Sequence, residues 1–343
     1  MADPRLHEHL VSLGATPEEL AAVDDEGGLI SLAGDLTLSR GLDLTLDELA
    51  ARCRVSAEQV RSLYAALGLD VERLSGFGEG DVDLVTLTMA DGTGLIDLVG
   101  AELFRVVGRS LRRIAETAVA AYVQDVESPP DEHGADLVGL AELNQIASGL
   151  AVDLGTALGP VFRHHLWVTV RDQRAGQDGV GPAQLIRAGI GFVDLVGFTP
   201  MAEELSPTDL MALVESFERR AHEVATGRGG QIVKSIGDEV MIAAPDHETV
   251  ADIALTLVQG FGESAATRPR GGISAGEVVF RLGDFYGPIV NRASRLVDTA
   301  EPGEVLTDIG PTASGGVPLR PVGTRQLKGF SNPVDAWAVE PGR

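Results

Sequence analysis

The sequence has little cysteine and no long apolar run. Cys53 is the one cysteine in 343 residues, so the chain cannot form an intramolecular disulfide, and we expect a reducing compartment, the cytoplasm. No stretch approaches about 18 uninterrupted apolar residues, and the first residues lack the basic start and apolar core of an export signal. The sequence therefore predicts neither a transmembrane segment nor a signal peptide.

Basic residues are also few. Lysine and arginine total 27 against 51 aspartates and glutamates, which gives a net charge of -24 at pH 7. Such a surface repels nucleic acids, because their binding draws its affinity from the neutralisation of phosphates by cations. We therefore expect no nucleic-acid partner. An anionic substrate would have to be met by a few well-placed cations or by a metal ion.

Length and composition indicate two folded domains. The chain is 44% hydrophobic and 23% charged, which is typical of a globular protein, and 343 residues exceed one ordinary domain. We predict an all-α domain over residues 1–170, a glycine-rich joint over 171–184 and a second domain over 185–343.

The first half has helical patterns throughout. Short helices are predicted at three polar caps that are followed by acidic residues, Thr16, Thr45 and Ser56. Apolar residues spaced by three or four predict a long amphipathic helix from Leu95 to Val126 and another from Leu137 to about Val170. The pair Gly159-Pro160 is expected to kink the second of these. No strand is predicted before residue 172.

The second half alternates strands with helices. Strands are predicted at Leu185 to Leu195, Gly230 to Lys234, Val240 to Ala244, Gly271 to Val279 and Ala336 to Val339. Helices are predicted between them, at Thr208 to Ala225, His247 to Phe261 and Val290 to Asp298. This order predicts an α+β domain of the ferredoxin-like type.

Two acidic residues of this domain lie in or beside apolar segments. Asp194 is the one acid in the largely apolar stretch Ile186 to Thr199, where an unpaired carboxylate would cost several kcal/mol. Asp238 follows Gly237 in a predicted hairpin turn. A salt-bridged acid and an ordinary turn residue are the structural alternatives. Together, carboxylates on neighbouring strands suit Mg²⁺, and two ions about 4 Å apart would serve in-line attack on a phosphoryl group.

Three longer phrases make the pattern specific. They are Phe192-Val-Asp-Leu-Val-Gly-Phe-Thr199, Lys234-Ser-Ile-Gly-Asp-Glu239 and Gly283-Asp-Phe-Tyr-Gly-Pro-Ile-Val-Asn-Arg-Ala-Ser-Arg295. In order and spacing they resemble the catalytic core of the class III adenylyl and guanylyl cyclases, over about residues 191–330. The resemblance implies a homodimer with two active sites at its interface, each drawing residues from both chains, and two Mg²⁺ or Mn²⁺ ions in each site.

Carried over by position, the resemblance assigns metal binding to Asp194 and Asp238, and recognition of the base to Lys234 and Asp284. Adenine N1 accepts a hydrogen bond, which a lysine donates, and adenine N6 donates one, which an aspartate accepts. Guanylyl cyclases resemble one another in carrying an acid and a small residue at the positions of Lys234 and Asp284. The lysine and aspartate found here therefore favour ATP as the substrate. A solvated lysine and a loop aspartate are the structural alternatives.

Asn291 and Arg295 are four residues apart, so they share a helix face. They match the asparagine and arginine that, by resemblance, hold the ribose and stabilise the charged transition state; a helix cap and a surface ion pair are the alternatives. Arg292 points about 100° away from Asn291 and is the weaker candidate. Lys328, in Gln326-Leu-Lys-Gly-Phe330, is similar to a family lysine near the triphosphate.

The layout of the first half resembles an actinobacterial group of cyclases in which a helical N-terminal domain inhibits the catalytic domain. That resemblance implies regulation by protons or by a lipid-like ligand. His164 and His165 lie in the long helix before the joint and are candidate pH switches, the alternative being exposed histidines without a role. Residues 44–68 resemble a helix-turn-helix without the basic stripe of a DNA reader.

The sequence therefore predicts an adenylyl cyclase that converts Mg-ATP into 3′,5′-cyclic AMP and pyrophosphate. The alternative from another class is a catalytically silent cyclase fold that binds nucleotide or a partner. A transcription regulator built on residues 44–68 is disfavoured by the acidic surface. A diguanylate cyclase is disfavoured because its Gly-Gly-Asp/Glu-Glu-Phe signature is missing; Ile236-Gly-Asp-Glu-Val occupies that hairpin.

Overall fold

The chain divides into two compact units, Met1–Asp178 and Gly179–Arg343. The structure, a computed structural model, describes residues 3–23, 25–89, 94–96, 100–126, 136–175, 185–260 and 268–342. The last helix of the first unit continues to Ala175, past residue 170, where we predicted the helical region to end. The rest of the predicted glycine-rich joint, residues 176–184, lies outside the described residues.

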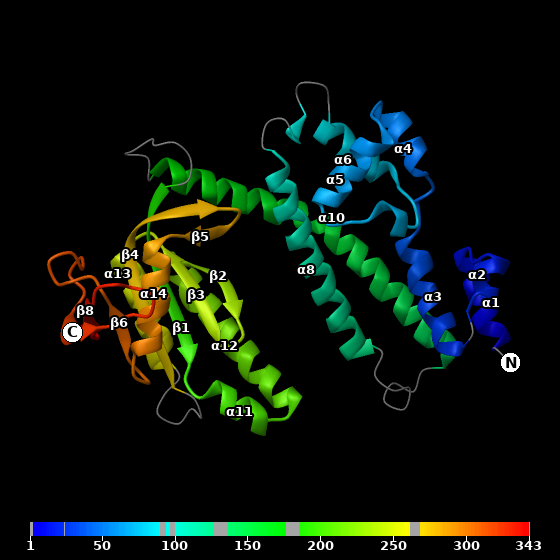
Figure 1. Cartoon of the computed structure of the whole chain (residues 1–343). Helices are drawn as coiled ribbons and strands as arrows, with labels where there is room; N and C mark the ends of the chain where they lie inside the picture. The colour runs from blue at the N-terminus through cyan, green and yellow to red at the C-terminus, as the bar shows by residue number, and fades with distance from the viewer. Residues whose placement is uncertain are drawn as a thin grey trace. The chain divides into compact units, whose positions relative to one another are not determined.

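The first unit is helical (Figure 1). Its helices are α1 (Pro4–Leu13), α2 (Pro17–Ala21), α3 (Glu26–Leu38), α4 (Leu46–Cys53), α5 (Ala57–Ala66), a 3₁₀ turn η1 (Val71–Arg73), α6 (Glu79–Met89), α8 (Ala101–Val126) and α10 (Leu137–Ala175). Extended pairing in the described part of this unit is limited to an isolated bridge between Leu44 and Phe77. The prediction of no strand before residue 172 is confirmed for these residues.

The three predicted helix caps are capping boxes. The side-chain oxygens of Thr16, Thr45 and Ser56 each accept a hydrogen bond from the backbone N–H three residues on, and the side chain at that position bonds back to the cap. This reciprocal bonding satisfies two donors that the start of a helix leaves unpaired.

One long helix begins later than we predicted. The apolar spacing predicted a helix from Leu95, but α8 begins at Ala101. Gly100 precedes it with a φ of 73°, a left-handed conformation that cannot continue a right-handed helix. Residues 97–99 lie outside the described residues.

Helix α10 is long and apolar enough to cross a membrane by length and composition. Leu137–Arg171 contains a window with a mean hydropathy of 1.2, of which 11% is buried, and no other described helix meets both criteria. Core helices of soluble proteins meet the same criteria. We predicted no transmembrane segment because no stretch of the sequence approaches about 18 uninterrupted apolar residues, and α10 is the segment on which that prediction depends.

The second unit is an α+β domain, as predicted. Its elements are β1 (Leu185–Leu195), α11 (Phe198–Glu204), α12 (Pro207–Gly227), β2 (Gln231–Ile236), β3 (Glu239–Ala244), α13 (His247–Gly260), β4 (Pro269–Arg281), β5 (Asp284–Tyr286), α14 (Pro288–Thr299), β6 (Val305–Thr307), β7 (Leu319–Arg325) and β8 (Val334–Val339). The sheet order is β2-β3-β1-β4-β6-β8-β7, with β5 paired to β4. Its first four strands have the order of a ferredoxin-like sheet.

Helices cover both faces of this sheet (Figure 1). Phe217 of α12 and Val250 of α13 belong to a buried cluster on one face, and Ala293 of α14 belongs to a cluster on the other. Gly272 of β4 lets α14 lie close to the sheet, because a Cβ there would be 2.2 Å from the backbone N of Val297. This close packing fixes the position of α14, the helix that carries Asn291 and Arg295.

Candidate active site

The two predicted metal acids lie together at one end of the sheet. Asp194 is the penultimate residue of β1, and Asp238 lies in the turn between β2 and β3. Gly237, at a φ of 64°, makes that turn, and its place between apolar strands matches the predicted hairpin. The backbone N of Leu195 donates to the carbonyl oxygen of Asp238 over 3.2 Å, which ties the end of β1 to the turn.

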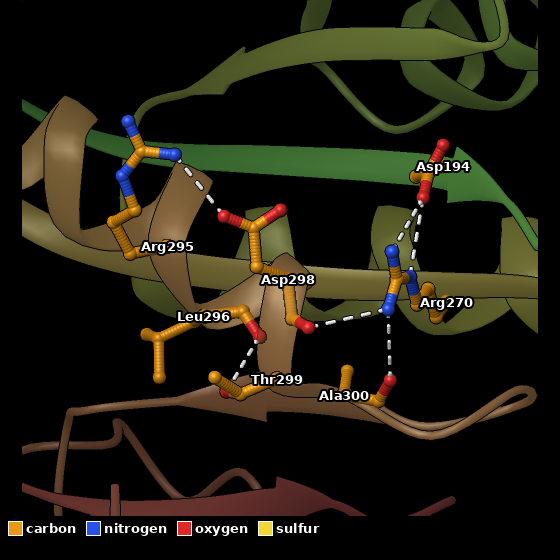
Figure 2. Close-up of polar contacts among 7 residues, drawn as sticks. All are labelled: Asp194, Arg270, Arg295, Leu296, Asp298, Thr299 and Ala300. Atoms are coloured by element: carbon orange, nitrogen blue, oxygen red, sulfur yellow. Dashed lines mark hydrogen bonds and ion pairs between the residues drawn. The ribbon is translucent and has the colours of Figure 1, made fainter. Parts of the chain in front are cut away.

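Arg270 of β4 holds the carboxylate of Asp194 (Figure 2). Its Nε and Nη2 donate to Oδ2 of Asp194 over 3.1 and 3.0 Å. Its Nη1 faces the carbonyl oxygens of Asp298 and Ala300 near the C-terminal end of α14, at 3.3 and 3.5 Å. Burial raises the pKa of Asp194 and the nearby Asp238 raises it further, while Arg270 acts in the opposite direction.

Glu239 adds a third carboxylate to this end of the sheet. It is the first residue of β3 and the register partner of Asp194. Burial raises its pKa to about 7, and the charges of Asp194, Asp298 and Asp238 contribute in that order. The crowding of carboxylates is a repulsion that a divalent cation would relieve.

The donor set fits a hard cation that is shared with phosphates. Within the described ranges, no group of three or more His, Cys, Asp or Glu side chains is arranged to hold a metal ion. Asp194 and Asp238 supply carboxylate oxygens, and Mg²⁺ is commonly held by one or two carboxylates together with water and substrate phosphates.

The raised pKa of Glu239 predicts a pH-dependent stability. In the folded chain the carboxyl keeps its proton to about pH 7, whereas its ordinary value is 4.5, so folding binds a proton and stability falls as pH rises from about 4.5 to about 7. In metal-free protein at pH 8, Glu239→Gln should raise the free energy of unfolding by about 1–2 kcal/mol, a value reduced because Glu239 is partly exposed. At pH 5 the variant and the unaltered protein should differ little.

Urea unfolding at both pH values, with a chelator present, measures this effect. Glu277→Gln, at an exposed carboxylate of β4, is the control. Equal pH dependence of the unaltered chain and the Glu239→Gln variant would contradict the raised pKa.

Lys234 and Asp284, 50 residues apart, form an ion pair. Nζ of Lys234 lies 2.5 Å from Oδ2 of Asp284, and the two side chains are 36% and 25% exposed. Lys234 follows a bulge in β2, a feature that changes the direction of side chains along a strand. Asp284 begins β5 directly after Leu282 and Gly283, whose φ values of 55° and 80° build a tight hairpin with β4.

Asn291 and Arg295 lie one turn apart on α14. Asn291 is exposed. Nη1 of Arg295 donates to Oδ2 of Asp298 over 3.1 Å, and both side chains are substantially exposed. In Figure 2 Arg295 points to Asp298 while Asp194 points to Arg270, so within one chain these two predicted site residues have separate partners.

The remaining predicted residues are exposed. Lys328 lies in the segment between β7 and β8. His164 and His165 lie on α10 in the first unit.

Sequence reasoning missed Arg270 and Glu239 as neighbours of the predicted metal acids. Both are register partners of Asp194, on β4 and β3. Arg270 is 76 residues from Asp194 in the chain. A signal for Glu239 was available, because it follows Asp238 directly at the start of an apolar strand; no local signal pointed to Arg270.

The second unit matches a known family. The model of the adenylate and guanylate cyclase catalytic domain matches residues 183–310, a range that includes every predicted site residue of this unit except Lys328. An uncharacterized protein of Mycobacterium tuberculosis is 33% identical over 99% of this chain and 92% of its own length. An adenylate cyclase of Streptomyces coelicolor is 33% identical over 74% of this chain and 67% of its own length. A pH-sensitive adenylate cyclase of M. tuberculosis is 28% identical over 98% of this chain and 88% of its own length.

Proposed function

Because the chain belongs to the class III nucleotide cyclases and its relatives include actinobacterial adenylate cyclases, we propose that it converts ATP into 3′,5′-cyclic AMP and pyrophosphate. The family includes both adenylate and guanylate cyclases, so the assignment of ATP as the substrate needs an observation from this chain. The direct contact between Lys234 and Asp284 is that observation.

The Lys234–Asp284 pair presents a donor next to an acceptor. Adenine presents the complementary edge, since N1 accepts a hydrogen bond and the neighbouring N6 amino group donates one. Guanine presents the opposite order at these atoms. A lysine facing N1–H of guanine and an aspartate facing its O6 would leave both groups of the protein wrongly paired.

The reaction needs positioning and charge stabilisation more than a protein nucleophile. The ribose 3′-oxygen attacks the α-phosphorus, the bond from that phosphorus to the pyrophosphate oxygen breaks, and the hydroxyl proton leaves to solvent. Arg295 donates to phosphoryl oxygens as negative charge develops, Asn291 orients the ribose, and Lys328 neutralises the triphosphate. Two Mg²⁺ or Mn²⁺ ions, held by Asp194 and Asp238, would lower the charge on the phosphates and the pKa of the 3′-hydroxyl.

The site is assembled from two copies of the chain. One copy supplies Asp194 and Asp238. The other copy supplies the base-recognising pair Lys234–Asp284 and the predicted site residues of α14. The separate partners of Asp194 and Arg295 within one chain support this arrangement, because neither side chain is directed at the other. A homodimer with a two-fold axis then contains two equivalent sites.

Exchanging the base-recognising pair should change the preferred nucleotide. Lys234→Glu with Asp284→Cys places an acceptor opposite guanine N1–H and a donor opposite its O6, so the ratio of kcat/KM for ATP over GTP should fall by about 10²-fold or more. Cyclic AMP and cyclic GMP are quantified with each nucleotide. The control exchanges another ion pair of this unit, Arg228→Gln with Asp252→Asn. An unchanged ratio in the Lys234/Asp284 variant would remove the basis for assigning ATP.

The first unit acts as a regulator of this enzyme. The relative named a pH-sensitive adenylate cyclase aligns with 98% of this chain, so the likeness extends through the helical unit. His164 and His165 are exposed on α10, the last helix of the first unit, and histidine is the side chain that most often serves as a pH switch in proteins. A bias of about 1.4 kcal/mol between two states changes a small active population tenfold. A lipid-like ligand of the apolar α10 is the second candidate regulator.

Removing the first unit should therefore release the catalytic unit. A protein that starts at Gly179 should be several-fold more active than the full chain at neutral pH and should lose the pH response between about 5.5 and 8. Cyclic AMP production by both proteins across this range measures the effect. The full chain with His164→Gln and His165→Gln separates the histidines from the rest of the unit. Equal activities and equal pH profiles would mean that the first unit is a scaffold.

A further inference from the structure

Arg292 stands between the two predicted site residues of α14, but its side chain is directed into the unit. Its Nη1 donates to Oδ2 of Asp308 over 2.6 Å. Asp308, directly after β6, is almost fully buried, with 3% of its side chain exposed, whereas Arg292 is 32% exposed. The arginine that the sequence ranked below Arg295 as a substrate ligand is therefore committed to a buried carboxylate.

The Arg292–Asp308 pair is not arranged for stability alone. Nε of Arg292 and Oδ1 of Asp308 are both buried, and neither has a hydrogen-bond partner among the described residues. A buried ion pair stabilises a fold only when its remaining donors and acceptors are also satisfied, and apolar residues of similar volume often serve as well or better. We therefore expect the pair to position the segments that it connects.

Arg292 also contacts the loop that carries Lys328. Its guanidinium carbon lies 6.0 Å from the ring centroid of Phe330, within the range of a cation–π contact. Leu327 on the other side of Lys328 is fully buried in a cluster with Leu296 of α14. The loop is closed by a hydrogen bond of 3.1 Å from the N–H of Phe330 to the carbonyl oxygen of Leu327. Lys328 is thus an exposed residue of a loop that is attached to α14 at both ends.

We propose that Arg292 is a positioning residue, which holds the Lys328 loop and α14 in one fixed arrangement through Asp308 and Phe330. Resting on the function proposed above, this arrangement lets Lys328 and Arg295 reach the same triphosphate. Arg292 itself touches no substrate. A small misplacement of a positioned catalytic group costs up to about 10²-fold in rate. The loss of Arg292 therefore lowers the rate because it displaces Lys328.

The test neutralises the pair as a whole. Arg292→Met alone leaves a buried, unpaired carboxylate and can unfold the unit, so Arg292→Met is combined with Asp308→Asn. The full-length double variant should keep a thermal unfolding temperature near that of the unaltered protein while kcat/KM for ATP falls by about tenfold or more. Phe330→Leu keeps the ion pair and removes the ring, and it should give a smaller loss in the same direction. Arg320→Met, at an exposed arginine paired with Glu304 and Glu340, is the control and should change neither quantity.

A double-mutant comparison distinguishes positioning from a general structural effect. Lys328→Ala should reduce kcat/KM by about tenfold in the unaltered protein, but by less than about twofold when added to the Arg292→Met/Asp308→Asn variant, because Lys328 has then already lost its place. Full multiplication of the two losses would overturn the proposal, and so would unaltered kinetics of the neutralised variant.

Hydrogen exchange at the Phe330 amide gives a readout that does not depend on turnover. Its exchange should be at least about tenfold faster in the neutralised variant, while amides of β1 remain unchanged. If the unaltered protein forms no cyclic AMP, the proposed function fails, but the Phe330 amide still decides whether Arg292 fixes the loop. Unchanged protection of that amide would overturn the positioning role.

Discussion

Asp194→Asn and Asp238→Asn should each reduce cyclic AMP formation by about 10³-fold or more while the dimer remains folded. Each substitution removes one carboxylate from a donor set that has only two, and metal ions supply several kcal/mol of transition-state stabilisation in phosphoryl transfer. Asparagine preserves the shape of the side chain, so an acceptor for Arg270 remains at position 194. Initial rates at saturating Mg²⁺ and Mn²⁺, together with thermal unfolding, measure both parts of the expectation.

Asp335→Asn is the matched control, because this carboxylate is exposed on β8 of the same unit. It should leave the rate unchanged. The two site variants should also lose stabilisation by divalent ions, which the control should keep. Near-normal turnover of either site variant would mean that the assignment of metal ligands is wrong.

Two inactive chains should restore each other's activity. One carries Asp194→Ala and the other Arg295→Ala, so a mixed dimer has one site with both lesions and one site that is whole. With equal amounts and free subunit exchange, about half of the dimers are mixed, and about a quarter of the activity of the unaltered protein should return. The rate of cyclic AMP formation is followed after mixing, with exchange of subunits verified by differential labelling.

The informative control mixes two chains with lesions in the same half of the site, Asp194→Ala and Asp238→Ala. In every dimer of this mixture each site lacks one metal ligand, so no activity should return. Recovery in the control, or its absence in the first mixture after complete exchange, would contradict a site shared between chains.

The strong periodicity of apolar residues made the longer strands and helices predictable, but the short elements were not predicted. The apolar strand around Asp194 and the amphipathic helices α12 to α14 were located to within a few residues of their bounds. Strands β5 and β6 have three residues each, too few for an alternating pattern, and β7 is largely exposed. The start of α8 was misplaced because apolar spacing continues through Gly100, whose positive φ interrupts the helix.

Site residues that belong to a sequence motif were predictable, whereas residues that join the site only through strand pairing were not. Asp194, Asp238 and Lys234 lie in recognisable phrases of the sequence. Arg270 joins Asp194 only because β4 pairs with β1 in the observed register. The ion pair of Arg292 with Asp308 depends in the same way on how α14 packs beside β6. Contacts between segments that are distant in the chain set the electrostatics of the site. Such contacts can be identified only once the fold is known.

The most direct measurement of the account is the identity and amount of the product that the purified full-length protein forms from ATP. With Mg²⁺ or Mn²⁺ present, we expect one cyclic AMP and one pyrophosphate for each ATP consumed, and much slower conversion of GTP. The assay combines separation of labelled nucleotides with a pyrophosphate determination. Tight binding of ATP without any cyclic product, or release of ADP and phosphate in its place, would contradict the assignment of an adenylyl cyclase.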